Sequence, residues 1–292
     1  MRADTYKAAC VIGQHLEVGG LIEQTKERTT MPSVKLADVS LNYRFDGAEN
    51  APVLVLSNSL GTDLHMWDDQ VAAFAEHFRV LRYDTRGHGG SSVTPGPYSI
   101  EQLGQDVLGM LDAFGIERFA FCGLSMGGLI GQWLGIHAGE SLQRLVLCNT
   151  GAKIGTDEVW NTRIDSVLAG REQTMRDMRD ASIARWFTAE FAQANPAVAA
   201  RITDMIASTS PDGYAANCAA VRDADYRGQL AAVKAPTLIV CGAKDPVTTV
   251  EHGELIQANI PGAELVAFEA AHLSNVEAGD AFTQRVLTFL RG

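Results

Sequence analysis

A serine between two glycines is the first candidate for chemistry in this chain of 292 residues. Ser125 lies in Gly123-Leu124-Ser125-Met126-Gly127, after the apolar run 119–122 and before the helix-patterned segment 129–134. A strand, a sharp turn and a helix are the context in which a G-x-S-x-G serine projects above a sheet. The same five residues can also form an ordinary glycine-rich turn, but their placement between strand and helix favours a nucleophile at Ser125.

A serine hydroxyl needs a histidine base, and that base needs an acid to hold its tautomer. In enzymes with this elbow the chain order is serine, acid, histidine. Asp245 follows the apolar run 238–241, and His272 follows the apolar run 265–268. Both stand just past a predicted strand, so Asp245 and His272 are predicted to be the acid and the base.

Other residues compete for these roles less well. Asp84 precedes the serine and falls outside the expected order, while Asn149, at the end of an earlier strand, carries no charge. His88 lies in a glycine-rich segment that shapes a loop, and His137 falls too far along the helix after Ser125. The alternative for Asp245 is an Asx turn before the proline that follows it.

Acyl transfer also needs hydrogen-bond donors aimed at the developing oxyanion. The backbone N–H of Met126, directly after the nucleophile, is one candidate. The second is expected from the loop after the apolar run 53–56, which reads Asn58-Ser59-Leu60-Gly61. The N–H of Leu60 is the candidate in that loop.

Short, nearly all-apolar runs surround these residues and predict a buried sheet. Such runs are typical of parallel strands covered on both faces by helices, and they lie at 53–56, 80–83, 119–122, 145–148 and 238–241. The looser alternation over 34–45 predicts an antiparallel edge strand or hairpin. A helix is predicted from Ile100 to Phe114, with a capping box that begins at Ser99 and a stop at Gly115. The alternation predicts an α/β architecture with a mostly parallel sheet flanked by helices.

The strand pattern breaks between residues 151 and 231, where the sequence becomes helical and amphipathic. We expect an inserted helical cap there, and a core made of 31–150 and 232–292; a separate domain is the alternative. The chain is 46% hydrophobic, which suits one large core. Residues 1–30 are predicted to be an extension outside the fold.

The composition of the chain disfavours several classes of binding partner. The formal charge of −11 makes nucleic acid and anionic membrane surfaces poor partners. No apolar run reaches the roughly 18 to 20 residues that a membrane span needs. Cys122, Cys148 and Cys241 lie in apolar runs and are predicted to be buried free thiols, which favours a cytoplasmic protein over a disulfide framework.

Metal and cofactor motifs do not stand out. No H-x-x-H pair, Cys-x-x-Cys pair or dinucleotide fingerprint stands in a suitable context, so neither a metal nor a cofactor is expected. The oligomeric state, monomer or homo-oligomer, stays open.

Four segments together resemble 3-oxoadipate enol-lactonases, which have the α/β-hydrolase fold with an inserted helical cap. They are the elbow 122–128, the stretch 144–150, the cap opening 153–156 with 160–164, and the segment 271–277. The likeness extends from about Pro32 to the C-terminus. The Ser125, Asp245 and His272 pattern is shared by the whole superfamily and indicates only the reaction class. The cap segment and the sequences around Asn149 and Asn275 are shared more narrowly, and they indicate the substrate.

The resemblance implies hydrolysis of 3-oxoadipate enol-lactone to 3-oxoadipate in the catabolism of aromatic compounds such as protocatechuate and catechol. Ser125 would attack the lactone carbonyl while His272 takes its proton, and water activated by His272 would release the acyl-enzyme. The ring oxygen leaves as an enol, a better leaving group than a simple alkoxide.

The lactone keeps a free carboxylate, so an acidic chain must provide a local cation near the cap. Arg163 beside Trp160 is the first choice, and Arg185 beside Trp186 is the second. Either arginine could instead be a solvated helix residue with its stem packed on the aromatic ring.

Three other functions stay open. A broad carboxylesterase and a carbon–carbon bond hydrolase use the same three residues, and a non-catalytic ligand receptor can be built on the same fold. Haloalkane dehalogenases and epoxide hydrolases are disfavoured because they use aspartate at the elbow, where this chain has Ser125.

Overall fold

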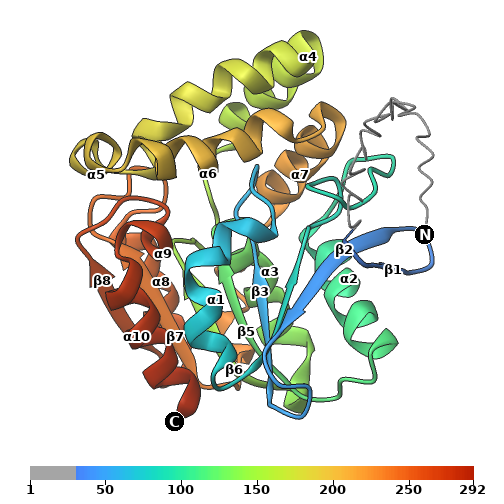
Figure 1. Ribbon diagram of the computed structural model, residues 1–292, viewed down its shortest axis with the longest axis vertical. Coiled ribbons are helices and arrows are strands. Elements are labelled where there is room, and N and C mark those ends of the chain that lie inside the picture. The colour runs from blue at the N-terminus through green and yellow to red at the C-terminus, as the bar shows by residue number, and fades with distance from the viewer. Residues whose placement is uncertain (1–30) are drawn as a thin grey trace, which may run out of the picture. The chain divides into compact units, whose positions relative to one another are not determined.

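An eight-stranded sheet forms the centre of the structure, a computed structural model that describes residues 31–292. The strands are β1 (Ser33–Lys35), β2 (Ser40–Asp46), β3 (Val53–Ser57), β4 (Arg79–Tyr83), β5 (Phe119–Leu124), β6 (Leu142–Cys148), β7 (Thr237–Gly242) and β8 (Glu264–Phe268). Their order is β1-β2-β4-β3-β5-β6-β7-β8 (Figure 1). The first two strands form the predicted antiparallel hairpin at the edge, β2 also pairs antiparallel with β4, and the remaining pairs are parallel.

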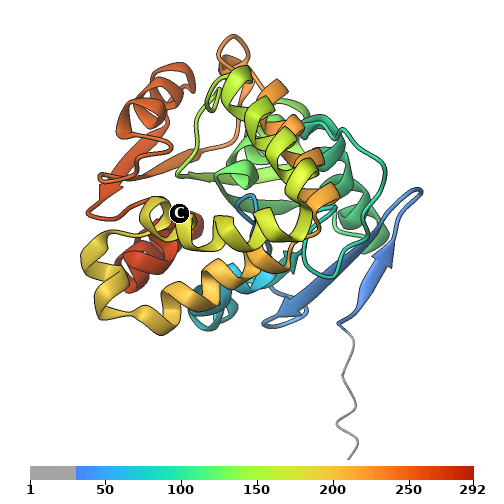
Figure 2. The same cartoon turned by 90° about the horizontal axis from the view of Figure 1, so that it is seen from above.

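Helices cover both faces of this sheet (Figures 1 and 2). On one face α1 (Asp68–Ala75) packs against α10 (Gly279–Arg291). On the other lie α2 (Ile100–Ala113), α3 (Met126–His137) and α8 (Val250–Asn259). Every residue of β5 and β7 is buried as a result, which is why their sequences are almost continuously apolar. The predicted α/β-hydrolase architecture is confirmed.

The helix α2 begins at Ile100 as its sequence predicts and ends at Ala113, one residue before the predicted end, with Phe114 as its C-cap. The Ser99 hydroxyl accepts a hydrogen bond from the Gln102 N–H at 3.1 Å, which satisfies a donor left free in the first turn. Gly115 follows the helix with a φ of 67°, a conformation that glycine adopts without strain.

Helices fill the segment predicted to be a cap. They are α4 (Asp157–Trp186), α5 (Ala189–Ala194), α6 (Pro196–Ser208) and α7 (Pro211–Asp223). In Figure 1 these helices lie across the top of the sheet, on the side to which the parallel strands point. Pro196 and Pro211 each open a helix, where the missing N–H of proline costs no hydrogen bond. The long α4 is kinked at Arg171, which has a φ of 52°.

Shorter elements complete the described chain: η1 (Leu64–Trp67), η2 (Gly139–Ser141), η3 (Leu230–Ala232) and α9 (Ser274–Glu277). Cys122, Cys148 and Cys241 are buried with free thiols, as expected. No helix in residues 31–292 combines the length and hydropathy needed to cross a bilayer. The prediction for residues 1–30 lies outside the described residues.

Candidate active site

Ser125 occupies the turn between β5 and α3 in a strained conformation, with a φ of 59°. Its N–H donates to the Cys148 carbonyl at 2.9 Å, and its carbonyl accepts from the Thr150 hydroxyl at 2.8 Å. The turn is too tight for side chains beside it: a Cβ on Gly123 would lie 2.1 Å from the Gly127 carbonyl oxygen. The two glycines therefore permit a backbone that holds the serine above the sheet.

Asp245 and His272 meet beyond the carboxyl ends of β7 and β8. His272 Nδ1 donates to Asp245 Oδ2 at 2.8 Å, and both side chains are buried. This bond leaves Nε2 of the ring as the proton acceptor, the arrangement that a general base next to a serine requires.

Further donors surround the Asp245 carboxylate. Oδ1 accepts from the N–H groups of Val247 and Thr248 at 2.8 and 3.1 Å, and Oδ2 accepts from the Thr248 hydroxyl at 2.8 Å and from Asn149 Nδ2 at 3.1 Å. Burial alone would raise the pKa of Asp245, but His272 and these donors outweigh it, so the pKa lies below its usual value. Asp245 can thus form the turn and bond to His272 at the same time, because most of the turn bonds use Oδ1.

Ser125, His272 and Leu60 line one small cavity of about 60 Å³ beneath the cap helices. Met126, the other predicted oxyanion donor, is the first residue of α3. Its N–H belongs to the first helical turn, where no intrahelical acceptor is available. The structure therefore brings together the residues that the chain order places far apart.

All four predicted cap residues also line this cavity: Trp160, Arg163, Arg185 and Trp186. The guanidinium carbon of Arg163 lies 4.8 Å from the centre of the Trp160 ring, and Arg185 donates to the Ser182 hydroxyl at 3.1 Å. Burial and the positive charge of Arg163 lower the pKa of Arg185. Arg163 therefore stacks on the tryptophan and faces the cavity at the same time.

No ion pair among residues 31–292 includes Arg163 or Arg185. Other cap arginines do have partners: Arg171 pairs with Asp212 at 2.6 Å, and Arg179 pairs with Asp204 at 2.6 Å. The cavity beside Ser125 is thus supplied with positive charge that no described carboxylate neutralises.

A family model described as alpha/beta hydrolase fold matches residues 52–278. The chain belongs to the α/β-hydrolase family. It is 44% identical over 249 residues to 3-oxoadipate enol-lactonase 2 of Acinetobacter baylyi, covering 85% of this chain and 92% of that one. Among solved structures it is similar to the enol-lactonase of Burkholderia xenovorans, with 47% identity, a TM-score of 0.87 and coverage of 89% and 100%. A thermophilic esterase of Thermogutta terrifontis with malate bound is 28% identical, with a TM-score of 0.83 and coverage of 89% and 98%.

These relatives identify the α/β-hydrolase chain as a hydrolytic enzyme, as its elbow predicted.

Two residues that fitted the acid and base roles less well in the sequence, Asp84 and His137, make other contacts in the structure. Asp84 accepts from the N–H groups of Leu64 and Gly90 at 2.8 and 2.7 Å, which shapes two loops. His137 ends α3 and stacks on Trp133. In residues 31–292 no cluster of three or more His, Cys, Asp or Glu side chains could hold a metal ion.

Several residues that line the cavity of this hydrolase were not predicted from the sequence, among them Ser59, Ser182, Tyr214, Ile154 and Ile206. Tyr214 is fully buried on α7, and burial raises its pKa. No local pattern marks a helical tyrosine as a cavity residue, because that depends on how the helix is turned toward the sheet. Thr248 had a weak signal, since a threonine three residues after an aspartate often shares its turn.

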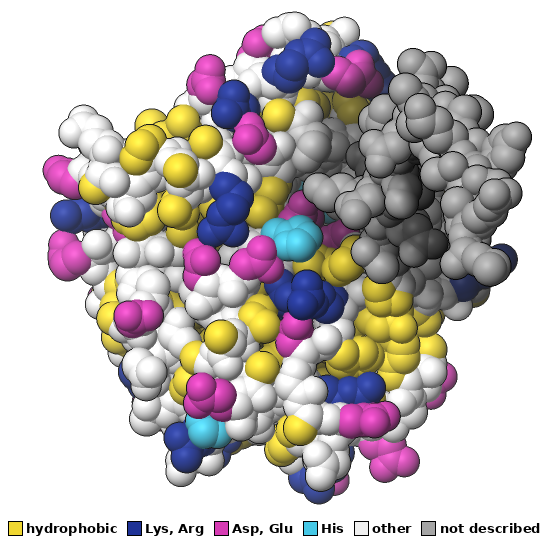
Figure 3. All heavy atoms as spheres, viewed as in Figure 1, with side chains coloured by type: hydrophobic (Ala, Val, Ile, Leu, Met, Phe, Trp, Pro, Cys, Tyr) yellow, Lys and Arg dark blue, Asp and Glu magenta, His cyan; other side chains and the backbone are white. Residues whose placement is uncertain are grey.

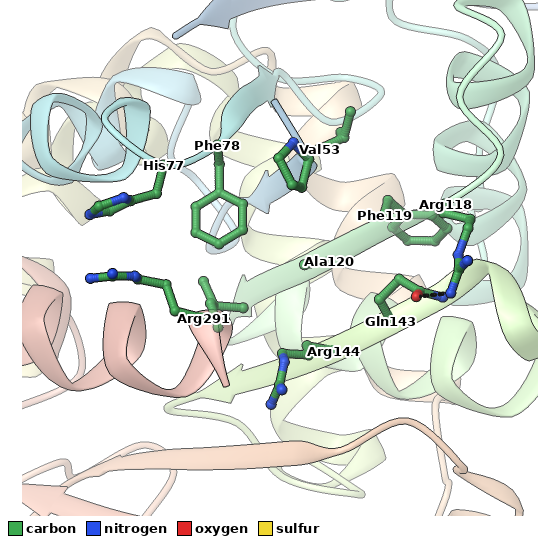
Figure 4. A pocket seen from close by; sticks show the side chains of 11 residues that line it. Val53, His77, Phe78, Arg118, Phe119, Ala120, Gln143, Arg144 and Arg291 are labelled. Atoms are coloured by element: carbon green, nitrogen blue, oxygen red, sulfur yellow. Dashed lines mark hydrogen bonds between the residues drawn. The ribbon is translucent and has the colours of Figure 1, made fainter. Parts of the chain in front are cut away.

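A larger hollow of about 540 Å³ lies at the other end of the sheet (Figure 4). Arg118, Arg144 and Arg291 line it together with apolar residues such as Phe119. Phe119 begins β5, whereas Ser125 follows the end of that strand. The hollow therefore contains none of the predicted site residues.

On the face shown in Figure 3, basic and acidic side chains are interspersed.

Proposed function

We propose that this hydrolase opens 3-oxoadipate enol-lactone to 3-oxoadipate. The observation that carries the proposal is the pair Arg163 and Arg185, which face the cavity of Ser125 and His272 without a carboxylate partner among the described residues. An anionic acyl substrate would supply that partner. The relatives named 3-oxoadipate enol-lactonase agree with this choice, and a place in aromatic catabolism follows from it.

In the proposed mechanism, Ser125 Oγ attacks the lactone carbonyl while His272 Nε2 removes the hydroxyl proton. The N–H groups of Leu60 and Met126 stabilise the oxyanion of the tetrahedral intermediate. The C–O bond of the ring then breaks, His272 returns the proton to the leaving enol oxygen, and the enol ketonises. His272 next activates a water molecule that hydrolyses the ester to Ser125, which yields the dicarboxylate product.

Asp245 acts through His272 in this mechanism. Its carboxylate, held by the turn at Thr248, fixes the ring so that Nδ1 carries the proton. It also stabilises the imidazolium that forms when Ser125 loses its proton.

We also propose that residues 151–231 act as the cap of the enzyme, with 31–150 and 232–292 as its core. Arg163 and Arg185 both belong to α4, so the cap carries the groups that bind the carboxylate and the core carries the groups that cut the ester. This division lets one core serve other acyl substrates when the cap changes.

Turnover of two substrates by the purified protein tests the proposal. We expect rapid hydrolysis of the enol-lactone and slow hydrolysis of a neutral p-nitrophenyl ester of similar size. The reverse ratio would identify a carboxylesterase. Failure to turn over either one would contradict the proposed chemistry and favour a receptor.

A further inference from the structure

The loop from Asn58 to Gly61, here called the oxyanion loop, is held by hydrogen bonds on two consecutive peptides. In the first, the Ser59 carbonyl accepts from the Thr62 N–H at 3.1 Å and from the Thr62 hydroxyl at 2.8 Å. The C=O and N–H of a trans peptide point in opposite directions. Thr62 therefore fixes the direction of the Leu60 N–H, the proposed oxyanion donor.

The next peptide is held by a buried histidine. The Gly61 N–H donates to His88 Nε2 at 2.9 Å, and His88 is only 1% exposed. Gly61 has a φ of 82°, and a Cβ there would lie 3.0 to 3.2 Å from side-chain atoms of Ile206 and Tyr214. The oxyanion loop thus lies between His88 on one side and the cap on the other.

The neighbours of His88 fix its tautomer. A neutral imidazole that accepts at Nε2 carries its proton on Nδ1, and the Arg86 carbonyl is hydrogen-bonded to the ring. Asn217 Nδ2 lies 3.3 Å from Nδ1 but donates its protons to the carbonyls of Arg86 and Gly213, both at 2.8 Å. Burial, which outweighs the bond to Arg86, lowers the pKa of His88 to about 4, so the ring is neutral at pH 7.

We propose that His88 is a positioning residue for the oxyanion hole: by accepting the Gly61 N–H it fixes the peptide that follows Leu60, and together with Thr62 on the preceding peptide it holds the direction in which the Leu60 N–H points. The Arg86 carbonyl, shared with Asn217 of α7, connects this contact to the cap. The inference rests on the proposed Ser125 chemistry, but not on the identity of the lactone.

Two substitutions at His88 test it. His88→Leu removes the acceptor, and His88→Gln keeps one. The readouts are p-nitrophenyl acetate hydrolysis and the rate at which a fluorophosphonate labels Ser125. Since losing one oxyanion donor typically costs about 100- to 1,000-fold in kcat, we expect misdirecting it in His88→Leu to lower kcat and labelling about 10- to 100-fold. KM should stay within about threefold, and His88→Gln should restore most of the rate.

The same two substitutions at His137 are the matched control, because His137 bonds to the Trp133 carbonyl at the far end of α3. Labelling within about threefold of wild type is expected for them. Equal kcat in wild type and His88→Leu would overturn the inference, as would a loss in His88→Leu that His88→Gln does not restore.

A measurement on the wild-type protein covers the case in which the variants do not fold. Nitrogen NMR should show a scalar coupling between the Gly61 amide nitrogen and His88 Nε2, with Nε2 unprotonated. A protonated Nε2 would overturn the inference. A wild-type enzyme that is labelled at Ser125 but leaves the enol-lactone intact would refute only the proposed substrate.

Discussion

Arg163 and Arg185 line the same small cavity, and each is partly buried. Burial and the charge of Arg163 both oppose the charged form of Arg185, yet an arginine side chain stays protonated at any physiological pH. The two positive charges therefore raise the energy of the empty site, and a substrate carboxylate between them would lower it.

We expect Arg163→Ala and Arg185→Ala each to weaken binding of the anionic lactone by about 10- to 100-fold, as the loss of a charge-assisted hydrogen bond does. The KM for a neutral ester should stay within about threefold, which steady-state kinetics on both substrates would show. Arg176→Ala, on an exposed part of α4, is the control. Equal losses on both substrates would assign the arginines to the cap structure instead.

His88 also gives a prediction about stability. Its pKa is about 4 in the folded protein, against an ordinary value of 6.5 that applies to the unfolded chain, so between these values only the unfolded chain binds the proton. Protonation of His88 does not lower the free energy of unfolding above pH 6.5. As the pH falls from 6.5 to 4, protonation of the unfolded chain lowers this free energy by about 3 kcal/mol. Urea unfolding across this pH range should show the decrease in wild type, and a shallower one in His88→Gln. Parallel curves would contradict the assignment.

At the scale of elements, Asn149 joins three strand ends. It follows β6 with a φ of 43°, its Nδ2 donates to Asp245 Oδ2 at 3.1 Å and to the Ala271 carbonyl at 3.2 Å, and its Oδ1 accepts from the Ser274 hydroxyl at 2.5 Å. Asparagine tolerates this backbone conformation better than most residues. The amide thus holds the loop of Asp245 against the loop of His272.

Asn149→Gly should keep the backbone conformation and lose the amide. We expect the free energy of unfolding to fall by about 1–3 kcal/mol, because buried partners lose their hydrogen bonds, and kcat to fall by about tenfold as the Asp245 and His272 loops separate. Denaturant unfolding and ester kinetics measure the two effects. Asn149→Asp should cost more activity, since its carboxylate would lie beside Asp245. Unchanged kcat in both variants would show that the loops hold their positions without Asn149.

At the scale of the whole molecule, the guanidinium of Arg86 connects the hairpin at the edge of the sheet to helix α2. Arg86, 2% exposed, follows β4. It donates to Asp106 of α2 at 2.8 and 2.6 Å, and to Asp38 of the β1–β2 turn at 2.7 and 3.0 Å. Burial raises the pKa of Asp106, while Arg86 opposes that effect. Without the arginine, a mostly buried carboxylate would have no cation beside it.

Arg86→Met should therefore lower the free energy of unfolding by about 3–5 kcal/mol, as the loss of one partner of a buried ion pair does. Arg227→Met removes an exposed pair with Asp225 and should change stability by less than about 1 kcal/mol. Chemical denaturation of both variants gives the comparison. A similar small change in both would show that the hairpin does not depend on Arg86.

The sequence by itself determined the features that depend on local pattern. The turn between the strand and the helix at Ser125 has a tight backbone that leaves no room for neighbouring side chains. The glycines at positions 123 and 127 therefore indicate this turn in the sequence. The closeness of Asp245 and His272 could be predicted because parallel strands bring their carboxyl ends to one edge of a sheet, so residues that follow neighbouring strands lie near one another. The capped helix at Ser99 and the helical segment 151–231 were visible for the same local reason.

Only the tertiary structure decided which side chains face one another across elements. Tyr214 and Ser59 reach the cavity because of how α7 and the oxyanion loop are oriented, and nothing near them in sequence encodes that. The bond between Gly61 and His88 joins residues 27 apart in sequence, and each looks like ordinary loop sequence alone. Such contacts depend on the packing of distant segments, whereas periodicity, caps and turns depend on neighbours along the chain.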